Sequence, residues 1–514
     1  MTGGRAIKRY VLLAVLVWSA ASISPAGAAA AAPTCASPPS ASGEWPVYGH
    51  DVANTRSQPA ERALGPDAAA ALSPAWTFST ASVGDAAGFQ STPVVDAGCV
   101  FLGSTSGAVY AVQAADGTLA WQRKLELTSA GLGGGIVGAP LVDRGRVIVL
   151  VDQAGAPYVE ALRETTGAVL WKSAPIVAAD GYYTNASPVL AGGMVVAGYS
   201  PAEGDPKGSG GFALIDPASG AIVRVSQAIP PADQAKGFAG AGLWSTPAYD
   251  PATRYLYWGA GNPFSKTKAH PNTDAILKID LDRRRPTFAQ VVAAYPGNVD
   301  QYTDTLQTLS GTPVCAASDN PSVPYPLDDP ACGQLDLDFG ASANLFTDSK
   351  GNKLVGDLQK SGVYHVAHAD SMTPAWSRIV GVSCQACNAA STAFDGRSAT
   401  GVGTPGGVMF SFGRDDGTPD WMSPIADGVH YQSTSVADGV LYTVDGNGFL
   451  DVIDAASGNA IARRPMSADT GVPTEGLTSN GVSIAEHTVF ASGSELPDAT
   501  GGATAGLIVA YRPG

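Results

Sequence analysis

The chain has 514 residues, a net charge of −15 and 45% hydrophobic residues. This length can bury one large core or several small ones, and the acidic balance argues against a nucleic-acid partner. The 62 glycines and 37 prolines indicate many tight turns rather than a disordered chain.

The N-terminus has the pattern of a secretory signal peptide, which we predict over residues 1–28. Arg5, Lys8 and Arg9 precede the apolar run VLLAVLVWSAA, and small residues follow it. The run is short for a membrane-spanning helix, and no later stretch is long enough to be one. We therefore expect a secreted or periplasmic protein without a membrane span, with residues 29–43 as a flexible linker.

From residue 44 to residue 514 the sequence repeats a unit of about 40 to 50 residues, a length typical of propeller blades. The first copy is STPVVDAGCVFLGSTSGAVYAVQAADGTLAW, with strand-like runs separated by turns and a final tryptophan. No helical periodicity competes with these runs. The pattern predicts an all-β fold, an eight-bladed β-propeller of four-stranded antiparallel blades. The eight copies begin near Ser91, Gly138, Ala186, Ser245, Ala341, Ser391, Ser433 and Ser479.

The two ends of the repeat region complement each other. The last copy ends at GLIVAYRPG without a closing tryptophan strand, whereas Leu72 to Phe78 (LSPAWTF) reads as a closing strand with no repeat before it. We expect this N-terminal strand to complete the last blade, because that pairing removes an open sheet edge.

The six cysteines are an even number, which suits disulfides in an oxidising compartment. Cys315 and Cys332 lie in an insertion at about residues 296–336 that interrupts the fourth and fifth blades. Cys384 and Cys387 form CQAC, for which a local disulfide is the favoured interpretation over a redox or metal pair. The sequence leaves the pairing open.

Polar residues gather at one end of three predicted hairpins. Residues equidistant from a hairpin turn share a rim, and Glu203 lies in the loop just beyond one of them. Each residue alone has an ordinary structural explanation, such as packing for Trp244 or a turn for Asn262. Together they could supply a flat stacking plate, oxygen ligands for a hard cation and a general base. The pairs are Trp244 with Asn262, Thr184 with Ser200, and Asp338 with Lys360.

The repeats and these motifs resemble the quinoprotein dehydrogenases that bind pyrroloquinoline quinone (PQQ) and Ca²⁺ in an eight-bladed propeller. The sequence is most similar to the polyvinyl alcohol dehydrogenase branch. The resemblance extends from EWPVYGHDVANTR, residues 44 to 56, to the last repeat. Its most specific stretches are GAGLWSTPAYDP with GAGNP, LDFGASANL and GDLQKSGVYHV.

The resemblance implies a role for each of these residues. Trp244 would stack on the quinone, and Thr184 and Ser200 would contact it. Glu203, Asn262 and Asp338 would bind calcium. Asp338, with Asp336 as an alternative, would also be the catalytic base, and Lys360 would lie beside the quinone oxygens as a catalytic and cofactor-binding cation.

The sequence departs from the family pattern at several positions. Ile136 and Val137 stand where the family has an arginine, and Gln90 stands where many relatives have a glutamate. The vicinal cysteine pair of methanol-dehydrogenase-type relatives is missing. Residues 133–138, GGGIVG, match a dinucleotide-binding pattern, but they lead into a strand-like run rather than a helix.

Two functions follow from the sequence. The first is an exported PQQ- and Ca²⁺-dependent alcohol dehydrogenase. The family branch implies a polymeric or secondary alcohol as substrate, and the lack of a CxxCH haem motif implies a separate electron acceptor such as a cytochrome c. The alternative is a catalytically inactive propeller that serves as an extracytoplasmic scaffold or polymer-binding module.

Overall fold

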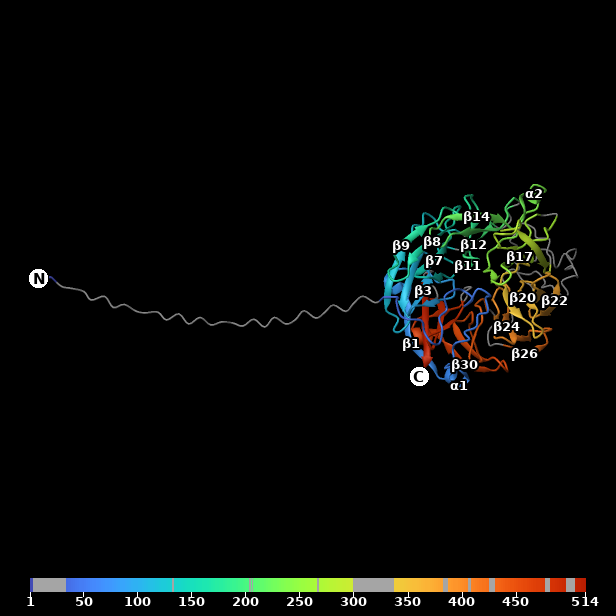
Figure 1. The fold of residues 1–514 in the computed structure, drawn as a ribbon. Coiled ribbons are helices and arrows are strands. Elements are labelled where there is room, and N and C mark those ends of the chain that lie inside the picture. The colour runs from blue at the N-terminus through green and yellow to red at the C-terminus, as the bar shows by residue number, and fades with distance from the viewer. Residues whose placement is uncertain are drawn as a thin grey trace. The chain divides into compact units, whose positions relative to one another are not determined.

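The structure, a computed structural model, contains eight small antiparallel sheets arranged as the blades of a propeller (Figure 1). These eight blades are counted over residues 1–2, 34–131, 134–202, 205, 207–265, 268–298, 337–381, 387–404, 408–424, 430–476, 481–495 and 504–514, which the structure describes. The predicted fold class is confirmed. Nearly all of the predicted signal peptide, residues 299–336 of the predicted insertion and the predicted blade start at Ser479 lie outside the described residues.

In blades 1 to 7 the strands follow one another in chain order from the central channel outwards, whereas in blade 8 the outermost strand is β1. Blade 1 has β2 (Val94–Asp96), β3 (Cys99–Gly103), β4 (Ala108–Gln113) and β5 (Leu119–Lys124). Blade 2 has β6 (Leu141–Asp143), β7 (Arg146–Val151), β8 (Tyr158–Arg163) and β9 (Val169–Lys172). Blade 3 has β10 (Tyr182–Tyr183), β11 (Val189–Ala191), β12 (Met194–Pro201), β13 (Gly211–Ile215) and β14 (Ile222–Gln227). Blade 4 has β15 (Ala248–Asp250), β16 (Tyr255–Gly259), β17 (Ala275–Asp280) and β18 (Val291–Pro296).

The second half of the ring continues the pattern. Blade 5 has β19 (Asn344–Thr347), β20 (Lys353–Leu358), β21 (Val363–His368) and β22 (Pro374–Ile379). Blade 6 has β23 (Ala393–Phe394), β24 (Ser398–Gly403), β25 (Val408–Gly413) and β26 (Pro419–Pro424). Blade 7 has β27 (Ser435–Ala437), β28 (Val440–Val444), β29 (Phe449–Asp454) and β30 (Ala460–Pro465). Blade 8 has β31 (Thr474–Glu475), β32 (Ser483–Ala485), β33 (Thr488–Glu495), β34 (Gly506–Pro513) and β1 (Leu72–Ser79). The short helices are α1 (Pro66–Ala70), η1 (Thr80–Val83), α2 (Pro231–Gln234) and α3 (Met466–Thr470).

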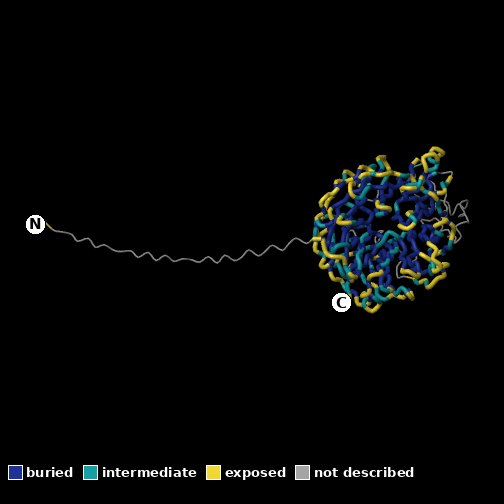
Figure 2. Tube along the Cα trace, viewed as in Figure 1, coloured by how far each residue is buried: buried dark blue, intermediate teal, exposed yellow. Residues whose placement is uncertain are grey.

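The last blade is closed by both ends of the chain, as predicted. Strand β1 pairs antiparallel with β34, from Leu72 opposite Pro513 to Ser79 opposite Leu507. In Figure 1 the blue β1 accordingly lies beside the red C-terminal strand. The core lies between the blades, where the faces of neighbouring sheets meet, and Figure 2 shows the exposed positions concentrated at the rim.

Tryptophans on the outer strands fasten one blade to the next. At five interfaces the indole lies against a turn glycine of the following blade, and a Cβ added to that glycine would lie 2.3–2.8 Å from the ring. The glycines have φ between 66° and 77°, a region that disfavours other residues. The indole nitrogen also donates to a main-chain carbonyl. The five pairs are Trp76 with Gly117, Trp121 with Gly167, Trp171 with Gly220, Trp376 with Gly417, and Trp421 with Gly458.

Blade 4 lacks this fastening on both sides. At the equivalent sheet position, just after the bulge in the outer strand, blade 3 carries Arg224 and blade 4 carries Ala293. The facing turns place Ala289 and Met372 at positive φ instead of glycine. The tryptophan and the glycine are therefore replaced together, as expected if a side chain on the turn residue would collide with the indole.

The segment of residues 44–58 crosses one end of the channel, and we call it the axial segment. It forms main-chain hydrogen bonds to the inner strands of six blades and side-chain bonds to blade 8, contacts that the sequence did not reveal. The bonds join Trp45 to Val95, Pro46 to Val142, Val52 to Tyr249, Ala53 to Leu345, Thr55 to Phe394, Arg56 and Gln58 to Val436, and Gln58 to Ile484.

Within the described residues, no helix has the length and apolar character needed to cross a bilayer. The one fully described disulfide joins Cys35 to Cys99 in blade 1, so the chain is tied to the propeller before the axial segment begins. Cys387 is also disulfide-bonded, whereas Cys315, Cys332 and Cys384 lie outside the described residues.

We expect Trp121→Ala to lower the free energy of unfolding by about 3–5 kcal/mol, because a large buried side chain and its hydrogen bond to Glu164 are lost. The matched control is Arg224→Ala at the equivalent position of blade 3. Its side chain is exposed, so the change should stay within about 0.5 kcal/mol. Urea unfolding followed by circular dichroism measures both variants, and equal losses would contradict the fastening role.

Candidate functional site

The sequence-predicted site residues lie at the ends of strands that surround the channel. Trp244 precedes β15 and Asn262 follows β16, whereas Asp338 precedes β19 and Lys360 follows β20. Blades 4 and 5 are neighbours, so these four residues come from two adjacent hairpins. The inner strands start at this end and run towards the axial segment, which contacts them further along.

Asp338 and Lys360 lie at the same rim, as the hairpin counting predicts, and there they form an ion pair. Lys360 Nζ lies 3.0 Å from Asp338 Oδ2, and the Lys360 amide donates to the Asp338 carbonyl at 2.9 Å. The other carboxylate oxygen of Asp338 accepts a hydrogen bond from the main-chain N–H of Asn262. Asp338 and Lys360 are 5% and 8% exposed, so the pair is nearly desolvated and its two charges hold each other in place. The carboxylate is thereby oriented by two blades at once.

Trp244 lies beside this pair. Lys360 Nζ lies 5.2 Å from the indole centroid, within range of a cation–π interaction. A Cβ added to Gly340 would come within 2.8 Å of the indole, so the glycine two residues after Asp338 is required for the ring to fit. The motif LDFG therefore supplies both the carboxylate and the space for the indole.

Ser200 presents a buried hydroxyl next to the indole. Ser200 is 1% exposed, and its Oγ has no hydrogen-bond partner among the residues that the structure describes. A Cβ added to Gly242 would lie 2.7 Å from this oxygen and 3.4 Å from the indole Cδ1, which places both groups around Gly242. A buried polar group without a partner costs stability, so this hydroxyl is a candidate contact for a ligand. Thr184 differs, because its hydroxyl already donates to the Gly198 carbonyl at 2.7 Å.

The predicted pairing of Trp244 with Asn262 is wrong in register. Ala248 pairs with Tyr257 in the regular ladder, but at the site end Ala241 donates to the Asn262 carbonyl. Asn262 thus lies opposite a residue three positions before Trp244. Counting from the turn assumes an unbroken ladder, and the ladder ends before the site. In blade 3, similarly, Ser200 pairs with Tyr183 rather than with Thr184.

Calcium ligation remains a prediction. Glu203 and the alternative base Asp336 lie outside the described residues. Among the residues that are described, no three His, Cys, Asp or Glu side chains gather as a metal cluster. Of the predicted calcium ligands, the structure therefore describes the amide residue Asn262 and the carboxylate Asp338.

Ile136, where the sequence resemblance implies an arginine, is fully buried in the core between blades 1 and 2. A Cβ added to Gly103 would lie 2.3 Å from its Cγ2, so the side chain is packed against blade 1. Val137 and Gln90 instead line a cavity that also contacts Trp244. A cation at position 136 would need a different backbone path to reach the channel.

Asp357 is a buried carboxyl that the sequence analysis missed. It is 0% exposed, neither oxygen has a hydrogen-bond partner, and a Cβ added to Gly259 would lie 2.6 Å from its Oδ2. Burial raises the pKa of Asp357 well above its usual range and so favours its uncharged form. Phe339 contacts the same Gly259 position, and Asp357 therefore lies behind the site without adding charge to the Asp338–Lys360 pair. Its place in GDLQK, inside a strand-like run, was the only sequence signal.

Comparisons with known proteins agree with this fold. The family described as outer membrane protein assembly factor BamB matches residues 68–237. No curated protein gives a significant sequence match. A quinohemoprotein alcohol dehydrogenase from Comamonas testosteroni has a TM-score of 0.68 at 13% identity, over 91% of this chain and 80% of that one.

Two further solved structures are similar to this chain in fold. A europium-containing methanol dehydrogenase has a TM-score of 0.66 at 14% identity, over 91% of this chain and 98% of that one. BamB from Moraxella catarrhalis has a TM-score of 0.52 at 14% identity, over 86% and 97%. At these identities the likeness is one of fold. The chain is a PQQ-like β-propeller, a fold that these dehydrogenases share with an assembly factor.

Proposed function

We propose that the protein is an exported, PQQ- and Ca²⁺-dependent dehydrogenase that oxidises an alcohol and passes the electrons to a separate acceptor such as a cytochrome c. The observation that carries the proposal is the convergence at one channel end of an indole, a buried Asp338–Lys360 pair and the unpartnered Ser200 hydroxyl. The finer choice of a polymeric or secondary alcohol rests on the sequence resemblance.

The described residues fit a flat, carbonyl-bearing cofactor. Trp244 offers a planar surface, Lys360 Nζ lies 5.2 Å from the centre of that ring, and the Ser200 hydroxyl lacks a partner beside it. Asn262 and Asp338 supply the oxygen chemistry that calcium prefers. Glu203 would add a second carboxylate. When bound, PQQ with calcium would supply an electrophilic carbon that accepts hydride from the alcohol.

The chain's own residues would prepare the alcohol for oxidation. Asp338 is the candidate general base, since its carboxylate is held by Lys360 on one oxygen and by the main-chain N–H of Asn262 on the other. A proton taken from a substrate hydroxyl would stay on this carboxyl. Lys360, whose ion pair with Asp338 would then be weakened, would stabilise negative charge that develops in the site.

Export is supported by the oxidised Cys35–Cys99 pair. Disulfides persist in oxidising compartments and are rare in the cytosol. The predicted signal peptide supplies the route, and a secreted or periplasmic location places the protein where an external electron acceptor can reach it.

A second function, a non-catalytic scaffold, is favoured by one observation. The matched family, described as an outer membrane assembly factor, covers residues 68–237, which are blades 1 to 3 and the strand that closes the ring. The Asp338–Lys360 pair lies outside this match. Scaffold and enzyme therefore differ in what blades 4 and 5 do, and cofactor binding separates them.

Calorimetric titration of the mature protein with PQQ tests the proposal directly. We expect one-to-one binding that requires Ca²⁺, because the site holds one planar aromatic surface and a set of oxygen ligands. A Trp244→Ala variant should lose most of the binding, since the stacking surface is removed. The absence of heat at micromolar concentrations, with and without Ca²⁺, would contradict the enzyme and favour the scaffold.

Asp338→Asn separates catalysis from binding. We expect alcohol-dependent dye reduction to fall by about 100-fold or more, because general base catalysis contributes about 10²–10⁴-fold. PQQ binding should remain measurable by the same titration. Asp370→Asn, an exposed change in the same blade, is the control and should leave turnover unaltered. Full activity in Asp338→Asn would rule out Asp338 as the base.

A further inference from the structure

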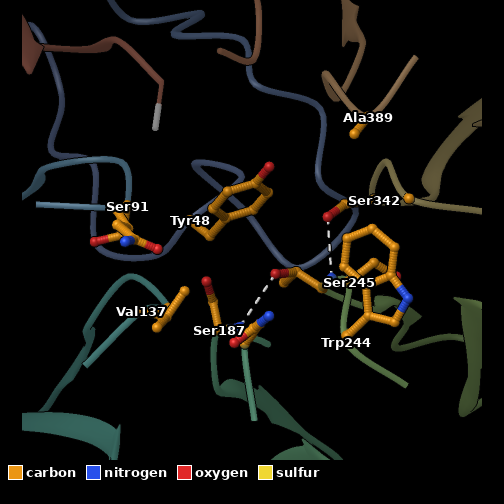
Figure 3. Close-up of a pocket in the computed structure, with 13 residues that line it drawn as sticks. Tyr48, Ser91, Val137, Ser187, Trp244, Ser245, Ser342 and Ala389 are labelled. Carbon is orange, nitrogen blue, oxygen red and sulfur yellow. Dashed lines mark hydrogen bonds between the residues drawn. The ribbon is translucent and has the colours of Figure 1, made fainter. Parts of the chain in front are cut away.

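The cavity that Val137 and Gln90 line is distinct from the Asp338–Lys360 pair and is bordered by the axial segment. It has a volume of about 110 Å³ and is lined by Tyr48 of the axial segment and by Trp244, Ser91, Asn185, Ser187 and Ser342, among others. Figure 3 shows these side chains arranged around Tyr48. Trp244 and Gly340 border both regions, whereas Asp338, Lys360 and Ser200 do not line this cavity, so the indole lies between the cavity and the ion pair.

A belt of hydroxyl groups encircles the cavity. Each belt hydroxyl oxygen accepts an amide N–H from the preceding blade, so its own hydrogen is left to donate. The hydroxyls of Ser391 and Ser433 are hydrogen-bonded to the Tyr48 hydroxyl, at 2.8 and 2.9 Å. The hydroxyl groups of Ser187, Thr246 and Ser342 line the cavity and can donate hydrogen bonds into it. The links run from Ala139 to Ser187, Ser187 to Thr246, Thr246 to Ser342, Ser342 to Ser391, and Ser391 to Ser433.

Two further polar groups in the cavity wall have no protein partner. The Ser91 side chain is 2% exposed, and its Oγ makes no hydrogen bond. The buried side-chain amide oxygen of Asn185 also has no hydrogen-bond partner among the described residues. Turning this amide over would present its N–H₂ group to the cavity instead, because the two orientations have the same shape. The cavity thus offers several donors and needs a ligand that accepts hydrogen bonds.

Arg56 places an uncompensated positive charge behind this cavity. Its side chain is 0% exposed, and its guanidinium lies 4.9 Å from the centre of the Tyr48 ring. All its hydrogen-bond partners are neutral, and no carboxylate lies within ion-pair distance among the described residues. Burial lowers the pKa of Arg56 to about 10, so the group stays charged at neutral pH. The partners are the carbonyls of Tyr48, Thr434 and Val482 and the hydroxyls of Thr92 and Ser435.

We propose that this cavity binds a small monovalent anion such as chloride. The hydroxyls of Ser91, Ser187 and Ser342 would donate to the ion, and the ion would offset the charge of Arg56. Buried charges in proteins are normally paired, and water would leave this one uncompensated. The net charge of −15 does not oppose the site, because exposed charges are screened beyond about 8 Å at physiological ionic strength.

Bromide is the probe that locates the ion, since it replaces chloride and scatters anomalously. Crystals of the mature protein grown in sodium bromide should show an anomalous peak between Tyr48 and Trp244, within hydrogen-bond distance of at least two serine hydroxyls. Density in the cavity without anomalous signal would identify water and overturn the proposal. Peaks confined to the protein surface would overturn it as well.

Thermal unfolding in solution gives an independent readout. At equal ionic strength, chloride should raise Tm by about 2–3 °C over gluconate, which is too bulky for the cavity. Ser91→Ala removes one donor to a charged ligand, so chloride should bind at least about tenfold more weakly and most of the gain should vanish. The matched control is Ser483→Ala, whose Oγ is also buried and unpartnered but does not line the cavity. Equal chloride responses in the two variants would contradict the assignment.

Discussion

The guanidinium of Arg56 connects blade 8, where the two ends of the chain close the ring, to its two neighbours. It donates to the Thr434 carbonyl in blade 7, to the Val482 carbonyl in blade 8 and to the Thr92 hydroxyl in blade 1. Blade 8 is the one that the two chain ends assemble, so these bonds hold it against both neighbours. Hydrogen bonds to a charged group contribute about 1.5–3 kcal/mol each. A single side chain therefore ties three blades at the point where covalent continuity is missing.

The axial segment has a second task at blade 4, which carries Trp244 and Asn262. This blade lacks the tryptophan–glycine contact on both of its faces, where Arg224 and Ala293 stand in place of indoles. The side chain of Asn54 donates to the Thr246 carbonyl in blade 4 and to the Ala343 carbonyl in blade 5, at 3.1 Å each. The two blades that form the candidate site are thus linked at the axis as well as by direct contacts, in which Tyr257 donates to the Ala369 carbonyl and Lys278 to the Asp370 carbonyl. The Asn54 bonds therefore contribute to the relative position of the two blades.

The sequence predicts what is local or repeated, and it misses what joins distant segments. Eight similar units and complementary ends are enough to predict the ring and its closure. In blade 5 the ladder also ends before the site, at Asn344 opposite Gly356, yet counting from the turn still places Asp338 opposite Lys360. In blade 4 the corresponding break leaves Asn262 opposite Ala241 instead of Trp244. The bonds of Arg56 span 378 and 426 residues, and no local pattern reports a contact of that range.

Charge balance connects the candidate site to calcium. Lys360 is already paired with Asp338, so among the described residues of the site its charge is offset. Ile136, where the sequence resemblance implies an arginine, is packed in the core. A quinone that carries several carboxylates would therefore need its charge offset by a cation that binds with it. Under the proposed function, calcium would act in cofactor capture as well as in chemistry. The affinities for the quinone and for the cation would then be reciprocally coupled, so that each strengthens the other by the same factor.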